Sequence, residues 1–108
     1  MMQDFESVEN RLDADGNPAG GHVRAPGLKI NWQDGPLGRG DDRREPNGAF
    51  VETVIAAAAQ RIAFYQDGRF ACLDNQAALE HLEAALDVLN HRTERREAAG
   101  TEGTHEGT

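Results

Sequence analysis

The sequence predicts an α+β fold in which a short N-terminal strand precedes an antiparallel two-helix hairpin, and the chain is expected to be oligomeric. Residues 28–32 (LKINW) alternate apolar and polar side chains, as a half-buried strand does. From Phe50, and again from Ala78, apolar residues recur at steps of three and four, which indicates amphipathic helices. A short connector between the two helical stretches favours antiparallel packing.

Both ends of the chain differ in composition from its middle. Residues 1–27 are acidic and rich in Gly and Pro, and residues 100–108 are Gly, Thr and Glu with one His. Such segments bury too little apolar surface to offset the entropy lost on ordering, so we expect both to be flexible. Residues 28–99 then form the folded, ligand-binding and oligomerising domain. That stretch is small for an isolated core, and self-association is therefore expected.

The strand is expected to start after Pro26 and Gly27, and a long surface loop follows over residues 34–48. Asn47 is a suitable N-cap for the first helix, and Gly68 is a suitable stop. The apolar positions of this helix are Phe50, Val51, Val54, Ile55, Ala58, Ile62 and Tyr65.

The second helix is expected to be capped by Asp74 or Asn75 and to run to about Ala98, before Gly100. Its apolar positions are Ala78, Leu79, Leu82, Ala85, Leu86 and Leu89.

Composition excludes several kinds of partner and site. A net charge of −8 and a pI near 4.8 would repel a DNA or RNA polymer, although a small phosphorylated ligand needs only a few cations. Cys72 is the only cysteine, so no intrachain disulfide or Cys-based zinc site can form, and a reducing cytoplasm is expected. No leader peptide or membrane-spanning run is recognisable. The histidines lack metal spacing, and no catalytic or nucleotide-hydrolysing motif is present. We therefore expect no cofactor, no metal, no membrane partner and no enzyme activity.

Arg92 and Arg96 form a candidate phosphate-binding pair near the end of the second helix. Residues four apart project from one helix face, and two guanidinium groups there can hold phosphates with bidentate hydrogen bonds. The alternative is structural, because cations near a helix C-terminus also oppose the helix dipole.

Two further groups could contact a nucleotide. Phe64 or Tyr65 could stack on a base, although a core role is the alternative, and Asn75 could read a base edge or only cap its helix. In a hairpin, Asn75 lies near the aromatic pair, whereas Arg92 is about 25 Å away along its own helix (~1.5 Å per residue). A head-to-tail dimer would bring Arg92 of one chain to Asn75 of its partner, which predicts a site between subunits.

Four stretches resemble the phage proteins of the Thoeris anti-defence 1 family. They are INWQDGP at residues 30–36, NGA at 47–49, FACLDNQAAL at 70–79 and NHRTERREAAGTEGTH at 90–105. The resemblance runs from about residue 28 to residue 106. It implies a sponge that binds glycocyclic ADP-ribose signals intact in the cytoplasm of the infected bacterial host. It also implies hexamers built from dimers, and binding of CBASS cyclic tri- or dinucleotides at separate sites.

The resemblance also implies which residues bind the ligand. These are Phe64 or Tyr65, Asn75, Arg92, Arg96 and a closing C-terminal loop that includes Thr101, Thr104 and His105. The chain departs from the family pattern at Ala99 and Thr101, where a basic residue and a valine are expected. Two other functions remain open: an enzyme that degrades a nucleotide messenger, and an inhibitor that binds a host protein.

Overall fold

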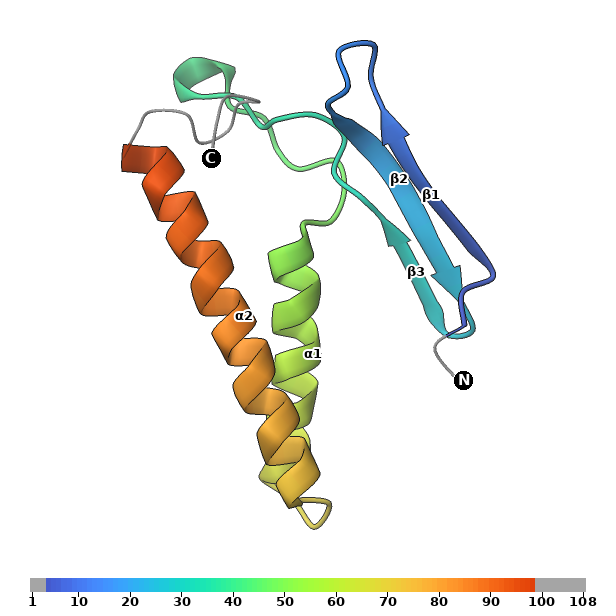
Figure 1. Cartoon of the computed structure of the whole chain (residues 1–108), viewed down its shortest axis with the longest axis vertical. Coiled ribbons are helices and arrows are strands. Elements are labelled where there is room, and N and C mark those ends of the chain that lie inside the picture. The colour runs from blue at the N-terminus through green and yellow to red at the C-terminus, as the bar shows by residue number, and fades with distance from the viewer. Residues whose placement is uncertain (1–3, 99–108) are drawn as a thin grey trace. The chain divides into compact units, whose positions relative to one another are not determined.

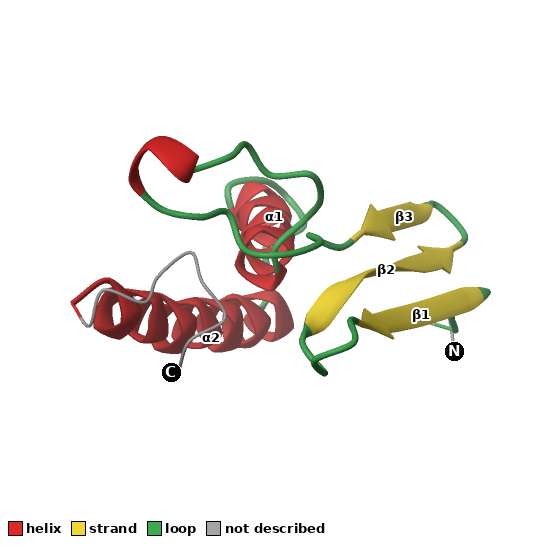
Figure 2. Cartoon of the chain, turned by 90° about the horizontal axis from the view of Figure 1, so that it is seen from above, coloured by secondary structure: helices red, strands yellow, loops and turns green. Residues whose placement is uncertain are grey.

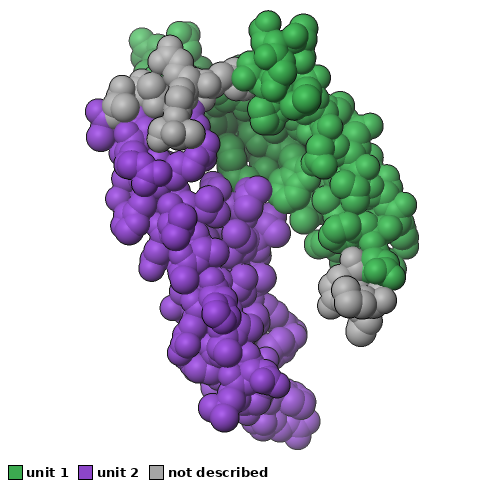
Figure 3. Space-filling model, in the orientation of Figure 1, with its two compact units in different colours: residues 1–50, 101–107 green, residues 51–100, 108 purple. Residues whose placement is uncertain are grey.

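The structure, a computed structural model, describes residues 4–98 and has a three-stranded sheet followed by two helices (Figure 1 and Figure 2). The predicted α+β class is confirmed. The chain divides into two compact units whose boundary lies between Phe50 and Val51 (Figure 3). The predicted folded stretch 28–99 therefore draws on both units. Residues 99–108, which include the predicted C-terminal tail, lie outside the described part.

The sheet consists of β1 (Ser7–Leu12), β2 (Pro18–Ala25) and β3 (Leu28–Asn31), all antiparallel, in the order β1-β2-β3. The expectation that residues 1–27 are flexible is wrong for β1 and β2. The prediction from composition considered only the apolar surface that a segment can bury. Pairing between strands also provides hydrogen-bond partners for the backbone N–H and C=O groups. β3 is present as predicted, and Pro26 and Gly27 form the turn before it.

Local turn chemistry brings the first two strands together. Between β1 and β2, the Asp13 Oδ1 accepts hydrogen bonds from the backbone N–H of Asp15 (2.9 Å) and Asn17 (3.0 Å). Gly16 supplies the positive φ of +83° that this turn needs. An aspartate that bonds to backbone groups ahead of it mimics a turn, and this turn positions β1 for pairing.

The loop between β3 and α1 is closed at its base by two side-chain amides. Gln33 Oε1 accepts from the backbone N–H of Asn47 (2.8 Å) and Gly48 (3.2 Å). The Asn47 side chain bonds both backbone groups of Asp34, its Oδ1 accepting at 2.8 Å and its Nδ2 donating at 3.0 Å. Asn47 is therefore not the helix cap that the sequence predicted, because its oxygen is used within the loop and α1 begins at Val51.

Two further features shape this loop. Trp32, the last residue of the predicted strand, lies beyond β3 and pairs with Ala49 in an isolated bridge. The loop also contains one short 3₁₀ turn, η1 (Gly40–Asp42). The predicted long surface loop is thus held at both of its ends by hydrogen bonds.

The second unit consists of α1 (Val51–Gln66) and α2 (Leu73–Ala98), which pack along each other. Figure 1 shows them side by side and running in opposite directions. α1 ends two residues before the predicted stop at Gly68. The predicted cap of α2 at Asp74 or Asn75 is also wrong. The Cys72 Sγ takes that position, accepting from the Asn75 backbone N–H at 3.4 Å.

One stripe on each helix is buried or half-buried at steps of three and four, and we call the two stripes the helix seam. Its members are Glu52, Ile55, Ala59, Ile62 and Gln66 on α1, and Asn75, Leu79, Leu82, Leu86, Leu89, Thr93 and Arg96 on α2. Ala59, only 8% exposed, allows the helices a close approach at the middle of α1. This spacing is typical of two helices that pack side by side with a small angle between their axes.

The predicted apolar stripes are wider than the seam. Val51 is 51% exposed, and Ala58 and Ala78 are exposed as well. One neighbouring helix covers only one stripe, so the remaining apolar positions lie beside the seam, where Val51, Ala58 and Ala78 are exposed and Val54 and Ala85 are half-buried. Val51, Val54, Ala58, Ala78 and Ala85 form this outer stripe, which we call the second face.

Candidate functional site

The structure places the predicted site residues at opposite ends of the helix pair. Phe64 and Tyr65 lie in the last turns of α1, and Asn75 lies in the first turn of α2. Arg92 and Arg96 lie in the last two turns of α2. Because α2 is one continuous helix, Asn75 and Arg92 are about 25 Å apart along its axis (~1.5 Å per residue). A single small ligand cannot contact both within one chain.

The aromatic end presents two rings beside a cation. Phe64 is 57% exposed, and its ring centroid lies 6.0 Å from that of the half-buried Tyr65, with the planes tilted by 55°. The Arg61 guanidinium lies over both rings, 4.8 Å from the Phe64 centroid and 5.2 Å from the Tyr65 centroid. Exposed aromatic faces held in a fixed orientation are suited to stacking on a nucleobase.

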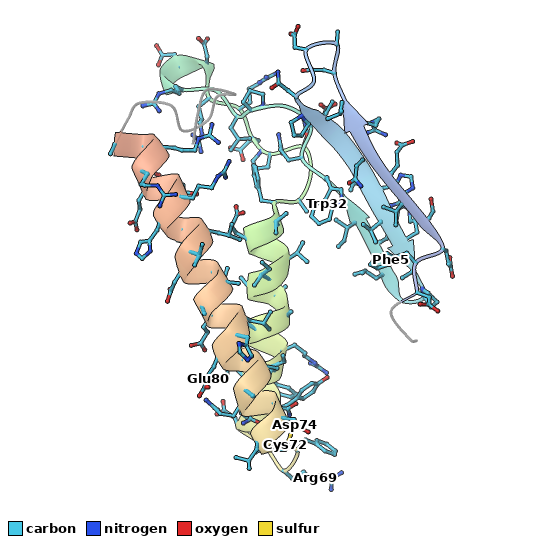
Figure 4. The ribbon with its side chains drawn as sticks, viewed as in Figure 1. Phe5, Trp32, Arg69, Cys72, Asp74 and Glu80 are labelled. Atoms are coloured by element: carbon cyan, nitrogen blue, oxygen red, sulfur yellow. The ribbon has the colours of Figure 1, made fainter. Side chains whose placement is uncertain are left out.

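Asn75 is held against the connection between the helices. Its side-chain Nδ2 donates to the Phe70 backbone oxygen at 3.2 Å. Gln66 secures the same connection, because its Oε1 accepts from the Cys72 backbone N–H at 3.0 Å and its Nε2 donates to the Cys72 oxygen at 3.1 Å. Figure 4 shows Cys72 and Asp74 at this end. With its amide nitrogen engaged, Asn75 can offer its Oδ1 as an acceptor to a ligand.

The arginine end differs from an ordinary solvated helix end. Arg92 and Arg96 are both half-buried, whereas Arg95 between them is exposed. Arg92 forms no ion pair with any residue in the described range 4–98. A half-buried guanidinium without a carboxylate partner is a suitable site for an external anion.

The third part of the predicted site cannot be placed. Thr101, Thr104 and His105, and the departure from the family pattern at Ala99, lie outside the described residues. The closing loop that they would form remains a prediction.

A contact that sequence spacing did not reveal joins β1 to β2. The Ser7 Oγ lies 2.7 Å from the His22 Nε2, and a Glu9 carboxylate oxygen lies 4.0 Å from the His22 Nδ1. Strand register, with Glu9 opposite His22, creates this group from residues far apart in the sequence. Ser7 is exposed and Glu9 is about half exposed, so water competes for every bond. We interpret the group as a cross-strand polar contact.

Neither a metal site nor a membrane-spanning segment is found in the described part. Residues 4–98 contain no cluster of three His, Cys, Asp or Glu side chains that could hold a metal ion. No helix there is long and apolar enough to cross a bilayer.

Sequence reasoning also missed Arg61, although its spacing of three and four residues from Phe64 and Tyr65 is the helical signal for such a contact.

Comparison with known proteins relates these features to a family. A family model described as "Acb2/Tad1, hairpin domain" matches residues 25–94. The chain is also 40% identical over 77 residues to "Thoeris anti-defense 1" from Bacillus phage SBSphiJ7, an alignment that covers 71% of this chain and 51% of that protein. The chain thus spans about half the length of this curated relative. The matched range contains β3, the aromatic end, Asn75 and Arg92, whereas Arg96 lies just beyond it.

Proposed function

The chain belongs to the Acb2/Tad1 hairpin family, and on that basis we propose that it is a phage anti-defence protein that binds and sequesters nucleotide immune signals without degrading them. The observation that carries the proposal is the arrangement along the helix pair. Aromatic rings and an amide lie at one end, and two half-buried arginines lie at the other. Acting on such signals, the protein would work in the cytoplasm of the infected bacterium.

The ligand class proposed is glycocyclic ADP-ribose. Its base would stack on Phe64 or Tyr65, and Asn75 would accept a hydrogen bond from the base edge. Its pyrophosphate would take charge-assisted hydrogen bonds from Arg92 and Arg96. The closing loop that the family resemblance implies would supply Thr101, Thr104 and His105. Cyclic tri- or dinucleotides are proposed as further ligands at separate sites, from the same resemblance.

A site of this kind requires two chains. The second face lies to one side of the seam on α1 and to the same side on α2, since the two helices run in opposite directions. Tyr65 and Arg92 lie on that same side, at opposite ends. A head-to-tail dimer that covers the second face would therefore bring Arg92 of one chain to the aromatic end of the other. A dimer is the minimum assembly, and the family resemblance implies a hexamer.

The small core supports self-association. Among the described residues, Val23 and Ala59 are the only buried apolar side chains, and each is 8% exposed. Val88 is 66% exposed and Leu73 is 88% exposed. A chain that leaves so much apolar surface in water gains stability by covering it with another copy.

Ligand retention tests the sponge function. The purified protein is expected to retain glycocyclic ADP-ribose through gel filtration and to release it unchanged on heating, as judged by mass spectrometry. Binding should also stabilise the fold by about 2.7 kcal/mol at a ligand concentration of about 100 Kd. A chemically altered ligand would indicate the enzyme alternative instead. Failure of every nucleotide to raise the melting temperature would favour the inhibitor of a host protein.

Mixing two inactive variants tests the intersubunit site. Asn75→Ala and Arg92→Ala are each expected to lose binding, and unfolding and refolding them together should restore about a quarter of the wild-type sites. Half of randomly formed dimers contain one chain of each kind, and only one of the two sites in such a dimer is intact. Titration calorimetry counts the sites. The doubly substituted chain, refolded alone, is the control. A mixture without binding would contradict a site completed by Asn75 of one chain and Arg92 of the other.

A further inference from the structure

We propose that Arg61 is a further ligand-binding residue, whose guanidinium, held against the Phe64 and Tyr65 rings, donates hydrogen bonds to a phosphate of the bound nucleotide. The inference rests on the proposed function and assigns a cation to the end of the site that otherwise contains rings and an amide. It therefore adds a charged contact about four turns of helix away from the arginine pair of the same chain.

Three contacts hold the Arg61 guanidinium in place. It lies over the Phe64 ring at 4.8 Å and over the Tyr65 ring at 5.2 Å, and its Nε donates to the Tyr65 hydroxyl at 3.3 Å. The spacing from Arg61 to the two aromatic residues is three and four, so one face of α1 presents all three groups. A guanidinium held in this way loses less conformational entropy when it binds an anion than a mobile surface cation does.

The donors of Arg61 remain available. An arginine has five N–H donors, and the bond to Tyr65 uses only the one on Nε. Within residues 4–98, neither Nη atom donates a hydrogen bond and no carboxylate forms an ion pair with Arg61, although Asp67 and Asp74 belong to the same end. A guanidinium with unused Nη donors and no carboxylate partner among the described residues can bind an external anion.

The position of Arg61 also fits the stacking geometry. Its guanidinium lies over one face of each ring, and a base would stack on the other face of the exposed Phe64 ring. A phosphate attached to that nucleoside then lies within reach of the Nη donors at the ring edge. The Arg61 guanidinium would thus contact the aromatic ring with its face and the phosphate with its Nη donors.

Arg69 provides a matched control. Its guanidinium lies 5.1 Å from the centroid of the Phe70 ring, at the same end of the helix pair. Phe70 is 65% exposed, and in the described part Arg69 has no hydrogen bond to fix its orientation. It therefore has the same charge and the same kind of ring contact as Arg61, without the second ring and the hydroxyl.

The experiment compares Arg61→Met with Arg69→Met, because methionine keeps much of the stem and removes the charge. Affinity for glycocyclic ADP-ribose is measured by titration calorimetry at about 50 mM and about 500 mM salt, over which screening of ion pairs changes strongly. Arg61→Met is expected to weaken binding by about tenfold or more at low salt and by clearly less at high salt. Arg69→Met is expected to change affinity by less than about threefold. Helix melting followed by circular dichroism should be unchanged in both.

Each other outcome has a defined meaning. If the wild type binds and Arg61→Met binds equally well at both salt concentrations, the inference fails while the proposed function stands. If the wild type does not bind, the proposed function itself fails. If Arg61→Met lowers the melting temperature, Arg61→Lys decides: binding that keeps the wild-type salt dependence supports a charged contact, and loss of that dependence overturns it.

Discussion

Arg92→Ala is expected to lower the affinity for glycocyclic ADP-ribose by about 100-fold while leaving both helices folded. Losing charge-assisted hydrogen bonds to a phosphate costs about 3 kcal/mol, and each 1.4 kcal/mol corresponds to about tenfold in affinity. Arg92 forms no ion pair within residues 4–98, so its removal leaves no described carboxylate without a partner. Titration calorimetry measures the affinity, and circular dichroism at 222 nm reports the helices.

Arg95→Ala is the matched control for this experiment. Arg95 lies one turn further along α2 and carries the same charge, but its side chain is exposed, whereas that of Arg92 is half-buried. It should bind ligand within about threefold of the wild type, since exposed charges contribute little. Equal losses in the two variants would mean that overall charge matters rather than a specific site. Unfolding of Arg92→Ala would show that the arginine is structural.

Gly21→Ala is expected to destabilise the sheet unit by about 3 kcal/mol or more. A Cβ on Gly21 would lie 2.0 Å from the Glu9 backbone oxygen and 2.9 Å from its carbonyl carbon. The φ of +134° at this position is also one that L-residues rarely adopt. Because β1 cannot move away without losing its pairing with β2, the clash is relieved only by opening the sheet.

Two spectroscopic probes separate the units in this experiment. Trp32, the only tryptophan of the chain, lies in the sheet unit, so its fluorescence follows unfolding there, whereas circular dichroism at 222 nm follows the helices. Gly16→Ala is the control. It has a similar backbone constraint, with φ of +83°, but its Cβ would meet no described atom within 4 Å. It should cost only about 1 kcal/mol. If Gly21→Ala and Gly16→Ala shifted the Trp32 unfolding transition equally, the clash of a Cβ at Gly21 with Glu9 would not be the cause of the destabilisation.

Much of the helical unit follows from local patterns in the sequence. Apolar steps of three and four predict two helices, and α1 (Val51–Gln66) and α2 (Leu73–Ala98) occupy those stretches. The separation of Asn75 from Arg92 also follows from sequence, because it needs only the rise of one continuous helix. An intersubunit site is therefore predicted from the sequence without any tertiary information.

The ends of the helices and the width of the apolar stripes were predicted less well. The Cys72 thiol caps α2 in place of Asp74 or Asn75, and the side-chain oxygen of Asn47 bonds within the loop and not at the start of α1. The predicted stripe on α1 combined the seam with the second face. Periodicity shows which face of a helix is apolar, but it does not show which neighbouring element covers each position on that face.

The sequence by itself determined the two helices and β3, since each depends on residues within one short window. Only the tertiary structure revealed β1 and β2, the close approach at Gly21 and the contact of Ser7 with His22. These features depend on strand register, which pairs residues distant along the chain, and a shift of one residue changes every cross-strand neighbour. Backbone pairing of this kind stabilises a segment whose composition is too polar for a core, and composition gives no sign of it.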